Sequence, residues 1–249
     1  MTRSLISAAL ASVALAAPAL AADGTAAPLK VLRTLVYAVT FTEKNTAEEK
    51  TSGFLGGDAG AITAGSATVK RNANVDDSGT LTVNVLAATQ DGALAVDAAF
   101  AGKATSQPTV RIVISPDGRL GYDPNKPIAP ETARILPLLA RGLVANRDVS
   151  PGSSWTIDAP APARGTTTYR VSALRDELAT LGIDGDLIVP GPQGFQEHDR
   201  GTVTYATDRL CPITYDLTAR SHHQASTEQY VSTNAHLTAT LVSDSFAKK

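Results

Sequence analysis

Apolar and polar residues alternate with a period of two along most of this chain, and no other feature limits its fold as strongly. In residues 30–44, one parity carries Val31, Leu35, Tyr37, Val39 and Phe41, while threonines occupy the other. Because successive side chains of a strand point to opposite faces, this pattern predicts a long strand with one buried face. Similar rows recur at 67–75, 81–87, 94–100, 110–114, 166–173, 179–189, 203–205, 213–219 and 230–243.

Short segments with turn-forming residues separate these rows, at 76–79, 90–92 and 115–118. Strands that follow one another at intervals of about 8–12 residues form antiparallel sheets rather than β-α-β units. The sequence therefore predicts a mainly β (α+β) fold. We expect an antiparallel meander of about 10–12 strands that forms a curved sheet or half-barrel.

The middle of the chain interrupts the meander with a helical pattern. Pro130 stands at a favourable helix start, and leucine, isoleucine and valine recur at helical spacing over residues 130–145. Pro137 lies inside this stretch and predicts a kink or a split into two pieces. The apolar stripe must be buried. Two interpretations remain open, a helix that closes one end of the sheet and a lid over an apolar cavity.

Residues 45–65 lack both periodicities, because a polar run at 45–50 is followed by closely spaced glycines. This composition predicts a loop. The Lys-Ser/Thr pair that a phosphate-binding loop needs after its last glycine is missing. A mobile flap over a cavity, formed by the glycine-rich residues 53–65, is the functional interpretation.

The first 21 residues have the organisation of a secretory signal peptide. Arg3 precedes an uncharged apolar run, and Ala19-Leu20-Ala21 is a small-x-small cleavage motif, which predicts cleavage before Ala22. The apolar run is shorter than the roughly 20 residues of a spanning helix. No cysteine stands immediately after the predicted cleavage site, so no lipid anchor is expected. We predict a periplasmic or secreted protein without a transmembrane anchor in the mature chain, with a loose tail at 22–28 and one β-rich domain at 29–249.

Charge and cysteine content exclude several classes of protein. The chain carries 22 basic and 24 acidic residues, a formal net charge of −2, and it lacks the basic surface that nucleic-acid binding requires. One cysteine excludes an intramolecular disulfide. Cys211 stands between apolar residues, which favours a small buried side chain. A nucleophilic thiol activated by His222 is the alternative.

The sequence contains no nucleophile elbow, metal-binding cluster or cofactor loop. Residues 197–200, Glu-His-Asp-Arg, are interpreted as a solvated turn. His222 and His223 are adjacent, and adjacent strand residues point to opposite faces, so they need not share a metal ion. We therefore predict a protein that is not an enzyme and that uses no cofactor and no metal ion.

The segment from Pro151 to Trp155 is the most distinctive local motif, because Pro-Gly favours a turn and the tryptophan then begins a strand. With this Pro-Gly-x-x-Trp turn, the chain resembles uncharacterised exported bacterial β-rich domains. Its layout is also similar to that of the periplasmic lipoprotein carriers (LolA-like), a curved half-barrel whose helices cover an apolar cavity. The second resemblance concerns architecture alone, and it places none of that family's functional residues on this chain.

Two functions are compatible with these observations. The first is an exported, non-catalytic envelope protein that binds a lipid or another apolar ligand inside the half-barrel, where small alanine side chains leave room. The second is a structural or protein-interaction module of the envelope, with an envelope protein as partner and a filled core. For the first, the predicted ligand-binding residues are those that project from inward rows, from the helix and from the Trp turn: Val83, Val96, Leu139, Trp155, Tyr169 and Tyr215.

Overall fold

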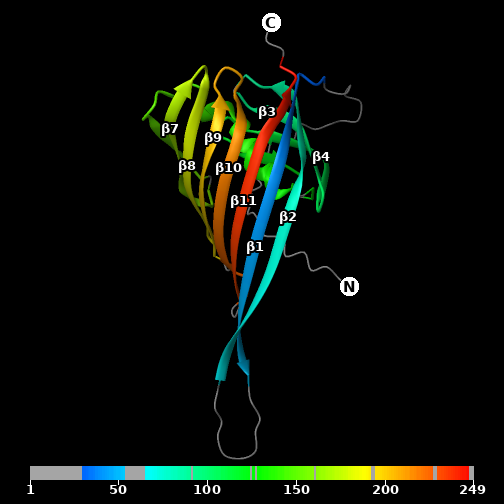
Figure 1. The fold of residues 1–249 in the computed structure, drawn as a ribbon, viewed down its shortest axis with the longest axis vertical. Coiled ribbons are helices and arrows are strands. Elements are labelled where there is room, and N and C mark those ends of the chain that lie inside the picture. The colour runs from blue at the N-terminus through cyan, green and yellow to red at the C-terminus, as the bar shows by residue number, and fades with distance from the viewer. Residues whose placement is uncertain are drawn as a thin grey trace, which may run out of the picture.

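The computed structural model describes residues 30–53, 65–90, 92–123, 125–126, 128–159, 161–191, 194–226 and 229–246. The strands form one 11-stranded antiparallel sheet in the order β5-β4-β3-β2-β1-β11-β10-β9-β8-β7-β6. The sheet is open and curved, and the helical segment lies on its hollow side (Figure 1). The predicted fold class and strand number are therefore confirmed.

The first and last strands are neighbours at the centre of the sheet, whereas β5 and β6, which follow each other in the chain, form its two edges. The strands are β1 (Arg33–Gly53), β2 (Gly65–Ala88), β3 (Leu94–Gly102), β4 (Ser106–Ile114), β5 (Leu120–Tyr122), β6 (Ser154–Asp158), β7 (Arg164–Arg175), β8 (Leu178–Val189), β9 (Phe195–Ala206), β10 (Cys211–Gln224) and β11 (Gln229–Asp244). The segment between β5 and β6 must therefore cross the hollow face from one edge to the other.

Burial follows the alternation in the sequence. On β8, Ala179, Leu181 and Ile183 are buried, while the side chains between them lie on the outer face. The same holds along β10 and β11, where threonines alternate with buried Leu217 and Leu237. Burial of these apolar rows is the main stabilising contribution to the fold, at about 25 cal/mol for each Å² removed from water.

The helical segment is broken into three short pieces. These are the α-helix α1 (Pro130–Ile135) and two 3₁₀ helices, η1 (Leu136–Leu139) and η2 (Arg141–Leu143). Pro137 lies in the first turn of η1, and it ends the α-helical hydrogen bonding because it has no N–H to donate. Ile135, Leu136, Leu138, Leu139 and Leu143 belong to the same buried cluster as the inward rows of the sheet. The predicted short, kinked helix is confirmed.

Two predicted turns have the expected geometry. Gly152 has a φ of +94°, and the Ser153 N–H donates to the Ser150 carbonyl at 3.0 Å, so the Pro-Gly turn leads into β6 as expected. At 115–118, the Gly118 N–H donates to the Ser115 carbonyl at 2.9 Å.

The turn predicted at 76–79 is wrong, because these residues lie within β2. Asp77 instead accepts hydrogen bonds from the backbone N–H groups of Ala104 and Thr105 in the β3–β4 turn, at 2.9 and 2.8 Å. Gly79 allows the close approach of β3, since a Cβ atom there would lie 2.3 Å from the Ala101 carbonyl oxygen. Aspartate and glycine are both common in turns, but here Asp77 and Gly79 lie in β2 and contact the neighbouring turn between β3 and β4.

The loop predicted at 45–65 is wrong over residues 45–53, which belong to β1 and pair with β2. Lys70 and Glu48 form an ion pair across this ladder at 2.7 Å, and Arg71 and Glu49 lie 3.8 Å apart. Residues 45–49 also pair with β11 on their other side, while the facing residues 69–73 of β2 are exposed, so no apolar row is needed there. Past this point the ends of β1 and β2 extend beyond the rest of the sheet (Figure 1). Residues 54–64 of the proposed flap, and the predicted signal and tail at 1–28, lie outside the described residues.

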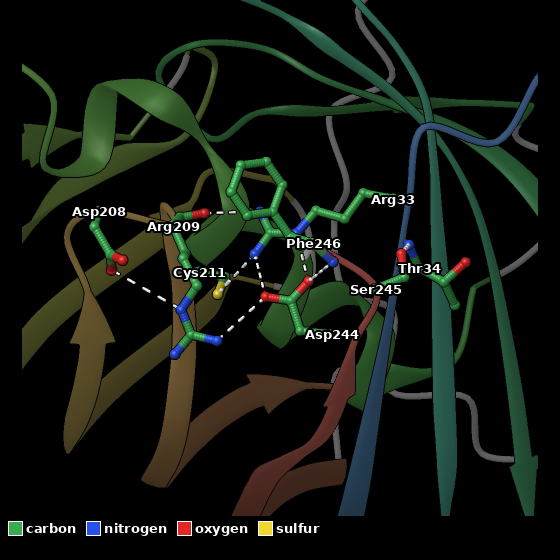
Figure 2. A network of polar contacts seen from close by, with 8 residues as sticks. All are labelled: Arg33, Thr34, Asp208, Arg209, Cys211, Asp244, Ser245 and Phe246. Carbon is green, nitrogen blue, oxygen red and sulfur yellow. Dashed lines mark hydrogen bonds and ion pairs between the residues drawn. The ribbon is translucent and has the colours of Figure 1, made fainter. Parts of the chain in front are cut away.

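Polar contacts join the first and last strands at the end of the sheet opposite this hairpin (Figure 2). Arg33 donates from Nε and Nη2 to the two carboxylate oxygens of Asp244, at 2.9 and 2.8 Å. Its Nη1 donates to the Arg209 carbonyl at 2.7 Å, and its Nη2 lies 3.2 Å from the Cys211 sulfur. Burial raises the pKa of the Cys211 thiol, although the Arg33 charge opposes this shift. The Cys211 thiol is thus buried among the polar contacts that join β1, β11 and the β9–β10 turn.

Candidate functional site

A cleft of about 320 Å³ lies between the helical segment and strands β7–β9. One wall comes from the β4–β5 turn at 117–120 and the opposite wall from the β6–β7 connection at 157–163, so the cleft lies along the seam where the two edges of the sheet fail to meet. The remaining lining comes from the helical segment and from the inner faces of β7, β8 and β9.

The walls of this cleft are largely apolar. Leu120, Pro137, Leu143, Ile157 and Leu187 provide the larger side chains. The space between them exists because several positions carry small residues, namely Ala133, Ala140, Ala163 and Gly185. These alanines lie in the helical segment and in the β6–β7 connection, whereas alanines of the inward rows, such as Ala98, Ala179 and Ala235, are packed in the hydrophobic core.

Two carboxylates of a buried ion triplet, Glu197 and Asp199, form part of the floor. Arg134 of α1 donates from Nη2 to Glu197 Oε2 at 2.8 Å and from Nη1 to the two Asp199 oxygens at 3.2 and 3.3 Å. Glu197 and Asp199 stand two residues apart on β9, so both point to the hollow side. The side chains of Arg134, Glu197 and Asp199 are 11%, 8% and 28% exposed, which leaves Asp199 as the member most accessible from the cleft.

The electrostatic balance of the triplet shifts the pKa of Asp199. Burial raises it, and Glu197 adds to the effect, while the charge of Arg134 lowers it; the result is a pKa of about 6. Burial alone would lower the pKa of Arg134, but the two carboxylates outweigh this and raise it. Arg134 therefore stays charged, and Asp199 is the group of the triplet that titrates near neutral pH.

The interpretation of residues 197–200 as a solvated turn is wrong, because they lie inside β9. Glu197 and Asp199 share the parity of Val203 and Tyr205, the buried residues further along the same strand. Extending the parity of that apolar row backwards would have placed both carboxylates inside. The charged residues interrupted the apolar pattern, and their partner Arg134 is more than 60 residues distant in the sequence.

Two tyrosines lie close to the triplet. Tyr169 lines the cleft, and burial, together with the Asp199 charge, raises its pKa to about 12. Burial also raises the pKa of Tyr215 well above its ordinary value. Trp155 stacks on Tyr169, with ring centroids 5.8 Å apart and an angle of 17° between the rings. These aromatic residues connect the cleft to the hydrophobic core.

Of the six predicted ligand-binding residues, Tyr169 is the one that lines the cleft. Val83, Val96, Leu139, Trp155 and Tyr215 are buried with it in one hydrophobic cluster. Their described contacts are packing contacts, and their contact with a ligand stays a prediction. Sequence reasoning missed Glu197, Asp199 and Arg134.

The histidines lie apart from the cleft floor. His198 contacts Asp186 at 2.8 Å and His236 contacts Asp216 at 2.9 Å, both on the outer face of the sheet. His222 stacks on Tyr230. Within the described residues, no group of three His, Cys, Asp or Glu side chains is placed to hold a metal ion. No helix in the same residues has the length and apolar character needed to cross a membrane.

Comparisons with known proteins give little further information. No protein-family model matches the chain, and no curated protein matches it. Among solved structures, the chain is similar to one titled "Lipid-protein interactions in lipovitellin", with a TM-score of 0.45 and 11% sequence identity. The likeness covers 89% of this chain and 26% of the other, so the chain spans about a quarter of that protein's length.

Proposed function

We propose that this protein is an exported, non-catalytic binding protein that holds one small apolar or amphipathic molecule in the cleft along the seam of the sheet. The observation that carries the proposal is the cleft itself, with its largely apolar walls and a few polar groups on the floor. Small-molecule sites commonly combine these features. The organisation of residues 1–21 supports the exported location.

The size of the cleft limits the ligand. Its volume of about 320 Å³ is at the lower end of the roughly 300–1,000 Å³ range of small-molecule sites. A single hydrocarbon chain or a small ring system fits this space better than a complete two-chain lipid. The proposed ligand is therefore a single-chain amphiphile, or one chain of a larger lipid whose remainder stays outside.

A second candidate function rests on the filled hollow face. Leu136, Leu138 and Leu139 of the helical segment are buried against the inward rows of the sheet. A half-barrel whose interior is occupied in this way also suits a structural or protein-interaction module without a ligand. The two candidates differ in whether the seam accepts a small apolar molecule.

Titration with the neutral fluorescent probe N-phenyl-1-naphthylamine tests the proposal. We expect saturable binding of one probe molecule per chain. Leu187→Trp should weaken it at least about tenfold, because the larger ring fills the cleft. Ile188→Trp is the matched control, since the neighbouring side chain lies on the outer face and is 45% exposed. Absence of saturable binding would favour the module without a ligand, and equal binding by both variants would show that the probe binds outside this cleft.

A further inference from the structure

We propose that the cleft selects amphiphiles with a cationic head, with Asp199 receiving a ligand ammonium group while the hydrocarbon chain lies between the helical segment and β7–β8. This inference rests on the proposed function and specifies its ligand class. It follows from the charge of the floor, the hydrogen bonds of Arg134 and the position of Asp199.

The floor carries an excess of negative charge. Two carboxylates, Glu197 and Asp199, face one guanidinium, that of Arg134. With both carboxylates ionised, the three charges sum to minus one. A buried charge without a full counter-charge is costly in apolar surroundings. A ligand cation would provide the missing positive charge, whereas a ligand anion would add a second unbalanced negative charge.

Arg134 is already committed to its two partners. Its Nη2 donates to Glu197 at 2.8 Å, and its Nη1 divides between the Asp199 oxygens at 3.2 and 3.3 Å. The contact with Glu197 is the shorter one, so Asp199 is the less tightly held carboxylate. A carboxylate accepts more hydrogen bonds than these, and Asp199 is the most exposed of the three side chains. Asp199 thus has both the access and the acceptor capacity for a further donor.

The other groups around Asp199 are compatible with a cation. Tyr169 approaches from β7, Tyr215 from β10 and Arg134 from α1, while Glu197 adds negative charge on the same strand. His198 lies on the opposite face of β9 and contacts Asp186 there. Among the residues described as lining the cleft, the basic side chain is Arg119, which pairs with Asp117 at 2.6 Å, and Asp158 and Asp186 are further acidic residues. An ammonium group would therefore meet carboxylates first.

Three probes with the same chain length separate the contribution of the head from that of the chain. Displacement of N-phenyl-1-naphthylamine by n-decylamine, 1-decanol and decanoate is measured at pH 7.5, below the concentrations at which the probes aggregate. We expect decylamine to bind about tenfold or more tighter than decanol, and decanoate to bind weakest, because a charge-assisted hydrogen bond is stronger than a neutral one. Asp199→Asn should lower the affinity for decylamine to about that for decanol and so remove the preference for the amine.

Asp184→Asn is the matched control, because it removes an exposed carboxylate that pairs with Arg200 outside the described lining of the cleft, and it should retain the preference for the amine. A pH series on the unmodified protein provides a measurement that needs no variant. Decylamine remains an ammonium ion, so its affinity should fall as the pH drops through about 6 and Asp199 gains a proton, while decanol affinity stays constant.

The outcomes distinguish this inference from the function on which it rests. Equal affinities for the three probes, or tighter binding of decanoate, would overturn the cationic preference and retain an apolar site. An amine preference that persists in Asp199→Asn and at low pH would also overturn it. If neither the fluorescent probe nor any of the three amphiphiles binds, the proposed function itself fails.

Discussion

At the scale of single residues, Asp77 and Glu131 show how burial gives opposite results for two carboxylates. Both are almost completely buried. Burial raises the pKa of Asp77, but hydrogen bonds from Ala104, Thr105 and Ser78 outweigh this and lower it. Burial raises the pKa of Glu131, and a hydrogen bond from its own backbone N–H does not outweigh this effect; its Oε2 has no partner among the described contacts. Asp77 is therefore stabilised as an anion and Glu131 as a neutral acid.

Asp77→Ala should lower the free energy of unfolding by about 1–3 kcal/mol at pH 7, because it leaves the N–H groups of the β3–β4 turn unsatisfied. The pKa of Asp77 is lower in the folded than in the unfolded state. Its stabilising contribution is therefore present above the unfolded pKa and is lost as the pH falls through the folded pKa. Urea denaturation at pH 7 and in acid measures this difference, and the exposed neighbour Asp76 provides the control Asp76→Ala, which should change stability by less than about 0.5 kcal/mol. A deficit that is the same at both pH values would contradict the role assigned to the ionised group.

Glu131→Gln should make the protein more stable at pH 8 by about 1 kcal/mol, because the amide keeps the shape of the side chain without a buried charge. The folded pKa of Glu131 lies above its unfolded value, so the unmodified protein loses stability as the pH rises between the two values. The variant and the parent should converge below the unfolded pKa. Thermal unfolding at pH 4 and pH 8 tests this expectation, and a variant less stable than the parent at pH 8 would refute it.

At the scale of elements, the helical segment is held on the sheet by leucine packing and by one ion triplet. Alpha-helix α1 is six residues long, which is too short to be stable alone. Its position therefore depends on tertiary contacts, of which Arg134 with Glu197 and Asp199 is the most polar. The same triplet shapes the cleft floor, so anchoring of the helix and the chemistry of the site are linked.

Arg134→Met should lower the free energy of unfolding by about 3–5 kcal/mol at pH 7, because it leaves two buried carboxylates without a counter-charge. The loss should be smaller at pH 5, since Asp199, with a pKa of about 6 beside Arg134, is readily protonated. Removing all three charges, in Arg134→Met/Glu197→Gln/Asp199→Asn, should restore much of the stability. Chemical denaturation of the single and triple variants checks this, and a triple variant no more stable than the single one would show that the cost is due to packing alone.

At the scale of the whole molecule, the fold depends on a contact between residues far apart in the chain. Strand β1 pairs with β11 over most of its length, from Leu35 with Asp244 to Glu49 with Gln229. The network of Arg33, Asp244 and Arg209 secures one end of this central pair and also binds the β9–β10 turn (Figure 2). The two halves of the sheet meet at this pair.

Asp244→Ala should lower the free energy of unfolding by up to about 3 kcal/mol, the lower end of the range for a broken buried pair, because Arg33 retains some contact with solvent. Burial raises the pKa of Asp244, but the hydrogen bonds from Arg33 and Phe246 outweigh this and lower it, so the contribution is lost in acid. Asp216→Ala, which removes an exposed partner of His236, is the control. If the network secures the pairing of β1 with β11, Asp244→Ala should unfold at a lower denaturant concentration than the parent; a midpoint equal to that of Asp216→Ala would argue against this role.

Much of this architecture could be predicted from local patterns. The alternation of Leu35, Tyr37 and Val39 predicts a strand and its buried face, and Pro137 predicts where the helix breaks. The turns at Pro151–Gly152 and at residues 115–118 were likewise predictable from their local residue types. These features were predictable because side-chain direction and backbone preference depend on a residue and its near neighbours.

The wrong predictions, at 76–79 and at 45–53, arose where contacts with residues distant in the sequence decided the structure. Asp77 and Gly79 have the local chemistry of a turn, and their partners, the β3–β4 turn and Ala101, lie more than 20 residues further along the chain. Residues 45–53 look like a loop until they pair with β2 and form cross-strand ion pairs. In each case a distant partner satisfied groups that, within the local sequence, favoured another structure.

The alternation along the chain established that this protein forms strands, which face of each is buried, and that a broken helix interrupts them. Which strands become neighbours, and that β5 and β6 form the edges with a cleft between them, depended on the pairing of β1 with β11 across the whole chain. The same arrangement of the sheet, with the helical segment on its hollow side, brings Arg134 to Glu197 and Asp199. The physical reason is that hydrogen bonding between strands and burial of ion pairs depend on distances in space, whereas the periodicity of side chains is a property of the backbone alone.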